Sequence, residues 1–305
     1  MKKFLLKSGF FFALTIFLLS LFLMGYGGNV DYFYQKFTTP KTHSMIIGDS
    51  RAMQGIQPQI IDSVLANKDY QLPMLNYAFT IAQAHIGPLY RKSILKKLAP
   101  DTKNGLFIIS LDPWMLMSRK SNDNNKGEFM ESGRPPHNMS FVSMNPNFEY
   151  LIKNYNYFHF KGIFKKKSLL HKNGWLEESN LPKDSTVFNA WKKGQIKMFH
   201  GFVNDYVISE LRKKSFDTLL KNFKNHGRIY LVRTPVDKEI LEIENSFYPN
   251  FEKYLDSVSK SNNIPYFNFN KSLKNYYETY DGHHINKYSG KEFTKALCDS
   301  IIHNM

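Results

Sequence analysis

Short apolar runs alternate with segments of helical spacing along much of the chain. Continuous apolar runs of this length, bounded by Gly, Pro or Asp, are typical of strands buried on both faces of a parallel sheet. Five such runs occupy residues 44–48, 72–78, 106–111, 228–233 and 264–268. Segments with apolar residues three or four apart occupy residues 57–65, 86–98, 207–223, 238–261 and 288–302. The alternation predicts an α/β fold of three layers, with a parallel sheet of about five strands between two layers of helices.

A strongly apolar run from Phe10 to Tyr26 follows three lysines, Lys2, Lys3 and Lys7. Its length is close to the roughly 17–25 residues that a helix needs to cross a bilayer. The lysines favour a cytoplasmic N-terminus, which puts the rest of the chain on the extracytoplasmic side. Residues 1–28 are therefore predicted to form a single-pass membrane anchor. A cleaved signal peptide ending near Gly25-Tyr26-Gly27 is the alternative.

Two further segments lack the strand and helix alternation. Residues 29–43 are polar and aromatic, and we expect a tether there. Residues 114–206 begin with a polar stretch and continue with an aromatic, lysine-rich stretch at 148–164. A structureless loop of this length is unusual in a compact domain, so it predicts a large insertion within a domain at 44–305. The aromatic side chains fit core packing, or contact with sugars or a membrane.

The net charge narrows the classes of partner. With 41 Lys and Arg against 26 Asp and Glu, the chain has a formal charge of +15, which attracts polyanions. The basic residues are spread over several segments, without zinc-finger spacing, a homeodomain pattern or an aromatic RNA-binding motif, so no nucleic-acid partner is expected. The single cysteine, Cys298, excludes an intramolecular disulfide or a cysteine metal cluster. We expect no metal and no cofactor.

Polar residues follow three of the predicted strands. Gly48-Asp49-Ser50 follows the first strand, Asp112 follows the third, and residues 280–284 follow the fifth. Ligands of an open parallel sheet bind at the carboxyl ends of its strands. Serine is a weak nucleophile that needs a base, usually a histidine oriented by a carboxylate, and Asp281 and His284 suit a tight turn that pairs them. At the start of a helix, Ser50 would also have backbone N–H groups directed at a developing oxyanion.

These residues resemble the SGNH/GDSL hydrolase superfamily. The resemblance rests on Gly48-Asp49-Ser50 after the first strand and on Asp281-Gly282-His283-His284-Ile285-Asn286 before the last helix, and it covers about residues 44–112 and 207–305. It implies a flavodoxin-like fold and an SGNH-like catalytic domain at 44–305. In that domain Ser50 would be the nucleophile, His284 the base and Asp281 the residue that orients it. The alternative is a capped strand-to-helix turn at Ser50, and we expect His283 in a solvated turn.

The oxyanion side departs from the family pattern. The family usually supplies a glycine from its second element; here Ala78 stands near that position, so Ser50, Ala78 and Asn76 are the candidate oxyanion donors. Asp112 replaces the usual asparagine, and an ionised carboxylate would repel an oxyanion. Either Asp112 is protonated, or it has another task such as capping the turn before Pro113, or Asn76 or Arg51 completes the hole.

Three residues are candidates for binding substrate, namely Arg51, Asp112 and Arg233. Arginine holds carboxylates and phosphates through two parallel hydrogen bonds. Both arginines lie near predicted strand ends. Structural ion pairs are the alternative for both of them.

An anchor followed by an SGNH-like domain with a large insertion resembles envelope acyl-transfer proteins, such as alginate O-acetyltransferases and the D-alanyl transfer protein of teichoic acids. The resemblance implies a multi-spanning membrane partner that donates the acyl group. We expect O-acylation of a surface glycan through an acyl-enzyme on Ser50. Hydrolysis of acyl esters, as in an SGNH-type carboxylesterase or deacetylase, is one alternative. A catalytically silent glycan-binding assembly protein is another. The sequence leaves the acyl group and the acceptor open.

Overall fold

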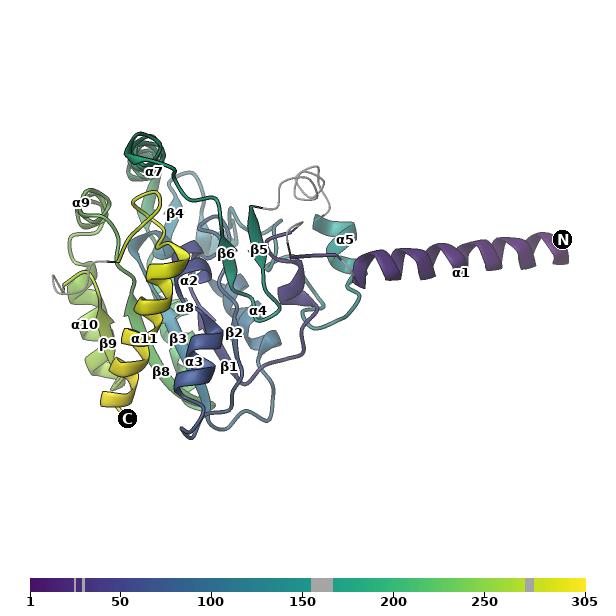
Figure 1. Cartoon of the computed structure of the whole chain (residues 1–305), viewed down its shortest axis with the longest axis horizontal. Coiled ribbons are helices and arrows are strands. Elements are labelled where there is room, and N and C mark those ends of the chain that lie inside the picture. Colours follow the sequence, from purple (N-terminus) through teal and green to yellow (C-terminus); the bar gives the residue numbers. More distant parts are fainter. Residues whose placement is uncertain (25, 29–30, 155–166, 272–276) are drawn as a thin grey trace.

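The computed structural model describes residues 1–24, 26–28, 31–154, 167–271 and 277–305, and shows a layered α/β domain from which one long helix projects (Figure 1). Its main sheet has five parallel strands in the order β2-β1-β3-β8-β9. Their bounds are β1 Ser44–Ile47, β2 Met74–Asn76, β3 Gly105–Ser110, β8 Gly227–Arg233 and β9 Tyr266–Asn268. The predicted α/β fold and its five-stranded parallel sheet are confirmed.

The strand order fixes where a ligand site should lie. Counting only the strands of the main sheet, the order is the flavodoxin-like 2-1-3-4-5, whose direction of winding reverses between the first and third strands. Ser50 directly follows β1, and Asp112 follows β3. Both residues that the sequence placed at strand ends are therefore at the edge where this fold binds ligands.

Helices cover both faces of the sheet because its strands are apolar on both sides. Met45 and Ile47 of β1 pack into one core cluster, and Ile46 between them packs into the other. On one face lie α2 Ser50–Gly55, α3 Pro58–Val64 and α11 Lys287–His303. On the other lie α4 Pro88–Lys97, α8 Glu210–Lys224 and α10 Phe251–Asn262. The helix predicted at 238–261 is interrupted around Pro249, as α9 Lys238–Phe247 and α10.

The segment between β3 and α8 has secondary structure of its own. It contains η2 Pro113–Leu116, β4 Met117–Arg119, η3 Asn124–Lys126, α5 Phe148–Asn154, β5 Ser168–Leu170, β6 Leu176–Glu178, α7 Ser185–Asp205 and β7 Tyr206–Ile208. The pairs β4–β7 and β5–β6 are antiparallel. Tyr150 of the aromatic stretch is buried. Tyr155, Tyr157, Phe158, Phe160 and Phe164 lie outside the described residues.

Part of the segment predicted as a tether packs into the domain. Residues Tyr34–Phe37 form a 3₁₀ turn, η1, and Tyr34 and Phe37 are buried in the core cluster that also contains α4. Lys36, also buried, donates hydrogen bonds from Nζ to the backbone oxygens of Asn76 and Gly174, both at 2.5 Å. Residues 34–37 are thus held by the sheet rather than free of it. Asn29 and Val30 lie outside the described residues.

The N-terminal helix α1, Lys2–Met24, projects from the domain (Figure 1). Its span from Lys2 to Phe22 is long and apolar enough to cross a membrane, and none of its most apolar stretch is buried against the rest of the chain. A cleaved signal sequence has the same features, so both N-terminal alternatives remain. At the other end of the chain, Cys298 is buried in α11.

Candidate active site

Ser50, His284 and Asp281 form a continuous hydrogen-bonded relay. Ser50 Oγ lies 2.8 Å from Nε2 of His284, and Nδ1 of the same ring lies 2.8 Å from Oδ2 of Asp281. Nδ1 carries the proton toward the carboxylate, which leaves the Nε2 lone pair facing the serine hydroxyl. In this arrangement a histidine can take the serine proton while the carboxylate fixes its tautomer. The structure brings together the three residues that the sequence proposed as catalytic.

The turn after β1 brings Ser50 to the start of α2. Asp49 caps this helix, because its Oδ1 accepts a hydrogen bond from the Arg51 N–H at 2.9 Å. Gly48 is required for close packing: a Cβ atom there would lie 2.6 Å from Cβ of Ala52 and 3.1 Å from Cβ of Ser110. Ser50 is therefore the first residue of α2, and its N–H belongs to the first helical turn, which lacks intrahelical acceptors.

A braced turn before α11 holds Asp281 and His284. Gly282 has a φ of +79°, which favours glycine, and its N–H donates to Oγ1 of Thr279 at 3.1 Å. Oδ1 of Asp281 accepts the backbone N–H groups of His283 at 3.0 Å and His284 at 2.8 Å. Burial alone would raise the pKa of Asp281, but the His284 charge and these hydrogen bonds lower it below its usual value. The carboxylate is thus ionised, as an orienting group must be.

Helix α7 contributes to the site, although the sequence gave no sign of this. Gln195 of α7 donates from Nε2 to Oδ2 of Asp281 at 2.8 Å, so the orienting carboxylate has two side-chain partners. On the opposite side, the Tyr280 ring stacks on the His284 imidazole with centroids 5.5 Å apart, and its hydroxyl donates to Oε1 of Gln54 at 2.7 Å. The base is therefore held in its plane as well as at Nδ1.

A cavity of 410 Å³ opens beside this relay. Asp281, Tyr280 and Gln195 line it together with Trp191 of α7. The Trp191 and Tyr280 rings meet edge to face, with centroids 6.4 Å apart. Aromatic faces of this kind bind the apolar faces of sugars as readily as other flat groups.

The two backbone and amide groups proposed for the oxyanion hole are already engaged. The Ala78 N–H donates to Oδ1 of Asn76 at 3.1 Å. Nδ2 of Asn76 donates to the backbone oxygens of Ala52 at 2.8 Å and Ile56 at 3.1 Å. Asn76 thereby ties β2 to α2. Of the three proposed donors, only the Ser50 N–H is left in a position that a helix start offers to an anion.

Asp112 is both a cap and a proton holder. Its Oδ1 accepts the Met115 N–H at 3.2 Å, which caps η2 as one of the sequence alternatives proposed. Burial, the charge of Asp49 and a hydrogen bond with Asp49 raise the pKa of Asp112 well above its usual value, against the opposing effect of Arg51. A neutral Asp112 beside an ionised Asp49 removes the repulsion that an oxyanion would otherwise meet there.

Arg51 and Arg233 point into the protein rather than into the cavity. Arg51 is buried and donates through Nη2 to Oε1 of Glu244; its Nη1 lies 3.7 Å from Oδ2 of Asp112. Arg233 is also buried, and its Nη2 lies 2.9 Å from Oε2 of Glu244 while its Nη1 donates to Glu252. Burial alone would raise the pKa of Glu244, but the two arginines lower it. The structure therefore places both arginines in ion pairs, the alternative to substrate binding.

His283 lies in the interior, and the expectation of a solvated turn was wrong for this residue. It is buried, and its Nδ1 accepts a hydrogen bond from Nε of Arg51 at 3.0 Å. Burial and the neighbouring charges of His284 and Arg51 lower its pKa well below the usual value, so the ring is neutral. Its ring packs on Phe199 of α7, with centroids 4.9 Å apart. His283 thus links the triad turn to the arginine pair and to α7.

Comparison with known proteins gives only remote likenesses. No family model matches the chain, and no curated protein matches its sequence. A candidate acylhydrolase from Bacteroides fragilis has 10% identity and a TM-score of 0.38 over 89% of this chain and 95% of its own. The native aryl esterase of M. smegmatis has 9% identity and a TM-score of 0.37 over 86% of this chain and 98% of its own. At this level of likeness, function has to be argued from the site itself.

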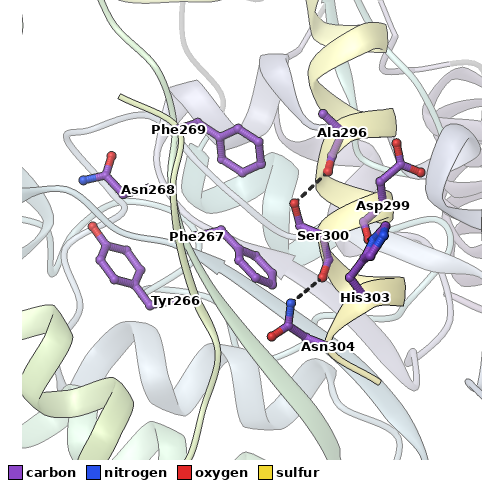
Figure 2. A pocket seen from close by; sticks show the side chains of 9 residues that line it. All are labelled: Tyr266, Phe267, Asn268, Phe269, Ala296, Asp299, Ser300, His303 and Asn304. Atoms are coloured by element: carbon purple, nitrogen blue, oxygen red, sulfur yellow. Dashed lines mark hydrogen bonds between the residues drawn. The ribbon is translucent and has the colours of Figure 1, made fainter. Parts of the chain in front are cut away.

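A larger cavity lies far from this chemistry. It has a volume of 660 Å³ and lies between β9 and the end of α11, where the rings of Phe267 and Phe269 face the helix (Figure 2). Its polar groups bond to the helix backbone: Ser300 Oγ donates to the Ala296 oxygen and Asn304 Nδ2 to the Ser300 oxygen, both at 2.9 Å (Figure 2). It contains no nucleophile paired with a base. Among the described residues, no group of three His, Cys, Asp or Glu side chains is placed to hold a metal ion.

Proposed function

We propose that the protein is a serine acyltransferase of the cell envelope, which O-acylates a surface glycan through an acyl-enzyme on Ser50. The relay from Ser50 through His284 to Asp281, with both hydrogen bonds at 2.8 Å, carries this proposal. An ionised Asp281 and a histidine with a free Nε2 lone pair are the two groups that make a serine hydroxyl nucleophilic.

The proposed reaction has two matched halves. In the first, the Ser50 hydroxyl proton passes to Nε2 of His284 while Oγ bonds to the acyl carbonyl carbon; the leaving oxygen then takes that proton from His284 and departs. In the second half, a glycan hydroxyl gives its proton to His284 and attacks the acyl carbon, and Ser50 Oγ leaves and recovers the proton. The Ser50 N–H faces the carbonyl oxygen in both halves, and Asp281 stays ionised throughout.

Two observations favour a glycan hydroxyl over water as the acceptor. Ser50 and His284 are only 6% and 9% exposed, which restricts bulk water at the acyl-enzyme. The adjacent cavity is lined by the Trp191 and Tyr280 rings, which suit a sugar. The apolar α1 supports a location at a membrane. A multi-spanning membrane protein as acyl donor remains part of the proposal.

Fluorophosphonate labelling tests the nucleophile. Such probes bond covalently to activated serines, so the parent protein should be labelled and the Ser50→Ala variant should not. Ser300→Ala is the matched control, because the Ser300 hydroxyl bonds only to the helix backbone oxygen of Ala296 among the described residues. An unlabelled parent protein would rule out the enzyme and favour a glycan-binding assembly protein.

Partitioning of an aryl acetate separates transfer from hydrolysis. Release of the aryl alcohol reports acylation of Ser50, and free acetate reports its hydrolysis. With a glycan acceptor present, we expect less acetate per aryl alcohol and an O-acetylated glycan in the mass spectrum. If the acetate yield is unchanged at every acceptor concentration, the protein is an esterase and the transfer proposal fails.

A further inference from the structure

A second cavity, of 320 Å³, lies on the other side of α7 and has a strongly basic lining. Apolar walls come from the loop after β2, from β4 and from the end of α7, through Ile81, Met117 and Phe202. Two arginines, Arg119 and Arg134, and the histidine His85 complete the polar lining. No residue of the Ser50 relay lines this cavity.

His85 is the most unusual group in this cavity. It is completely buried, and neither ring nitrogen has a hydrogen-bond partner among the described residues. Burial and the charges of Arg212, His137 and Arg134 lower its pKa well below the usual value, so the ring is neutral and offers one donor and one acceptor. Leaving both unmatched in a buried place is unfavourable. A ligand that enters the cavity would find both waiting.

The two arginines carry uncompensated charge. Within the described chain, neither Arg119 nor Arg134 lies within 4.0 Å of a carboxylate oxygen, whereas buried Arg212 next to them is paired with Glu131 at 2.9 Å. Arg119 donates through Nε to the Tyr206 hydroxyl at 3.2 Å, which fixes the guanidinium and leaves its two terminal nitrogens available. Free, fixed guanidinium groups bind carboxylates and phosphates through paired hydrogen bonds.

The cavity communicates with the catalytic side through a series of ring contacts. The Phe202 ring, which lines it, lies 5.8 Å from the Phe199 ring. Phe199 in turn lies 4.9 Å from His283, and His283 lies 4.1 Å from His284. Both cavities therefore flank α7 at the same end of the sheet, close enough for neighbouring units of one glycan to occupy them.

We propose that this cavity binds an anionic group on the acceptor glycan, a sugar carboxylate or a phosphodiester, with Arg119 and Arg134 holding the anion and His85 bonding to a hydroxyl of the same unit. This inference rests on the proposed glycan acylation and specifies its acceptor as an acidic polymer. It also gives a use to part of the chain's +15 formal charge, which the relay itself does not need.

Direct binding measurements test the proposal apart from catalysis. Full-length Ser50→Ala protein in detergent would be titrated by calorimetry with a glucuronate trisaccharide, its methyl ester and a glycerol phosphate trimer. The ester keeps the sugar but removes the charge. We expect an acidic probe to bind more tightly than the ester, and the preferred acid identifies carboxylate or phosphodiester as the group recognised.

Charge-matched variants locate the site. Arg119→Gln/Arg134→Gln should weaken binding of the acidic probe by about tenfold or more, because charge-assisted hydrogen bonds are lost. Lys120→Gln/Lys126→Gln removes two neighbouring charges that do not line the cavity, and should change the dissociation constant by less than about twofold. His85→Leu should weaken sugar binding about threefold without changing the charge. Equal weakening by both double variants, or no preference for an acid over the ester, overturns the proposal.

Labelling of Ser50 keeps this test distinct from that of the proposed function. The arginine double variant with Ser50 restored should react with fluorophosphonate at the parental rate, since neither arginine contacts the relay. Lost binding with retained labelling therefore supports the cavity as an acceptor site. Retained anionic selectivity in a parent protein that cannot be labelled leaves the cavity standing and removes the enzyme.

Discussion

Glu244 connects the catalytic turn to the arginine pair beneath it. Its two carboxylate oxygens accept from Arg51 and Arg233, and Oε1 also accepts from Nε1 of Trp114 at 3.0 Å. Arg51 in turn donates to His283, which precedes the catalytic histidine. One buried carboxylate thus satisfies two buried guanidinium groups that could not otherwise remain charged in the interior.

Replacing Glu244 should be strongly destabilising. Glu244→Ala leaves two buried arginines without a shared counter-charge, for which we expect a loss of about 3–5 kcal/mol in the free energy of unfolding. Urea denaturation measures this loss. The control is Glu242→Ala in the same helix: Glu242 is 64% exposed and pairs with Lys238 at 3.8 Å, so its change should stay within about 0.5 kcal/mol. Similar losses for both variants would contradict the structural role of Glu244.

The candidate site could be read from the sequence only where its residues are close along the chain or follow strand ends. Gly48-Asp49-Ser50 and the Asp281–His284 pair satisfy that condition, and the structure brings them together. Gln195 and Glu244 do not satisfy it. Each reaches the site through a tertiary contact, 86 residues from Asp281 for Gln195 and 193 residues from Arg51 for Glu244. Neither position has a local pattern that signals the contact.

Among the elements, the strands could be predicted and α7 could not. The strands of a parallel sheet are buried on both faces, so they stand out as continuous apolar runs. Helix α7 has 21 residues, but Phe199 is the one fully buried residue in it. Its apolar stripe is weak because it lies over the carboxyl edge of the sheet and faces cavities on two sides. Helices that cover a binding site leave little hydrophobic periodicity in the sequence.

Helix α4 is tied to the segment before β1 by a buried lysine. Nζ of Lys97 donates to the backbone oxygens of Thr39 and Val142, both at 2.7 Å, and lies 3.0 Å from Oγ1 of Thr39. A neutral amine satisfies all three contacts, since it has two protons to donate and one lone pair to accept the hydroxyl proton. Burial lowers the pKa of Lys97 from 10.5 to about 7.

This lysine should make stability increase with pH. Between about 7 and 10.5 the unfolded chain holds the Lys97 proton more tightly than the folded chain, so the free energy of unfolding rises with pH by about 1 kcal/mol per unit. Below about 7 both states are protonated and the destabilisation is complete. Denaturation between pH 8 and 9.5 should show a smaller slope for Lys97→Met than for the parent. Lys92→Met, an exposed lysine on the same helix, should keep the parental slope; equal slopes in all three proteins would exclude a neutral Lys97.

At the scale of the whole molecule, α1 is separable from the folded domain. Its residues up to Leu18 are exposed, and contact with the core begins at Leu19 and continues through Phe22, whose ring lies 5.7 Å from that of Tyr26. An apolar helix in water is unfavourable, so a membrane or a processing enzyme must remove it from solvent. The domain itself does not depend on it.

Deletion of residues 1–18 should release the protein from membranes without unfolding it. The full chain should sediment with liposomes and resist carbonate extraction, while the deleted form should remain in the supernatant. Its melting temperature should stay within about 2 °C of the parental value, because few core contacts are lost. Labelling of Ser50 by fluorophosphonate should be equal in both. A deleted form that melts much earlier would show that α1 packs on the domain in the native protein.

The sole cysteine gives the native chain an unusual advantage as a reporter. Cys298 is buried in α11, and burial raises the pKa of its thiol to about 12, so at neutral pH it is both shielded and protonated. A maleimide reagent would then react with a cysteine introduced at exposed Lys3 or Lys291 and with little else. Impermeant and permeant reagents applied to intact cells could therefore read the sidedness of each end of the protein, with no need to remove a native thiol first.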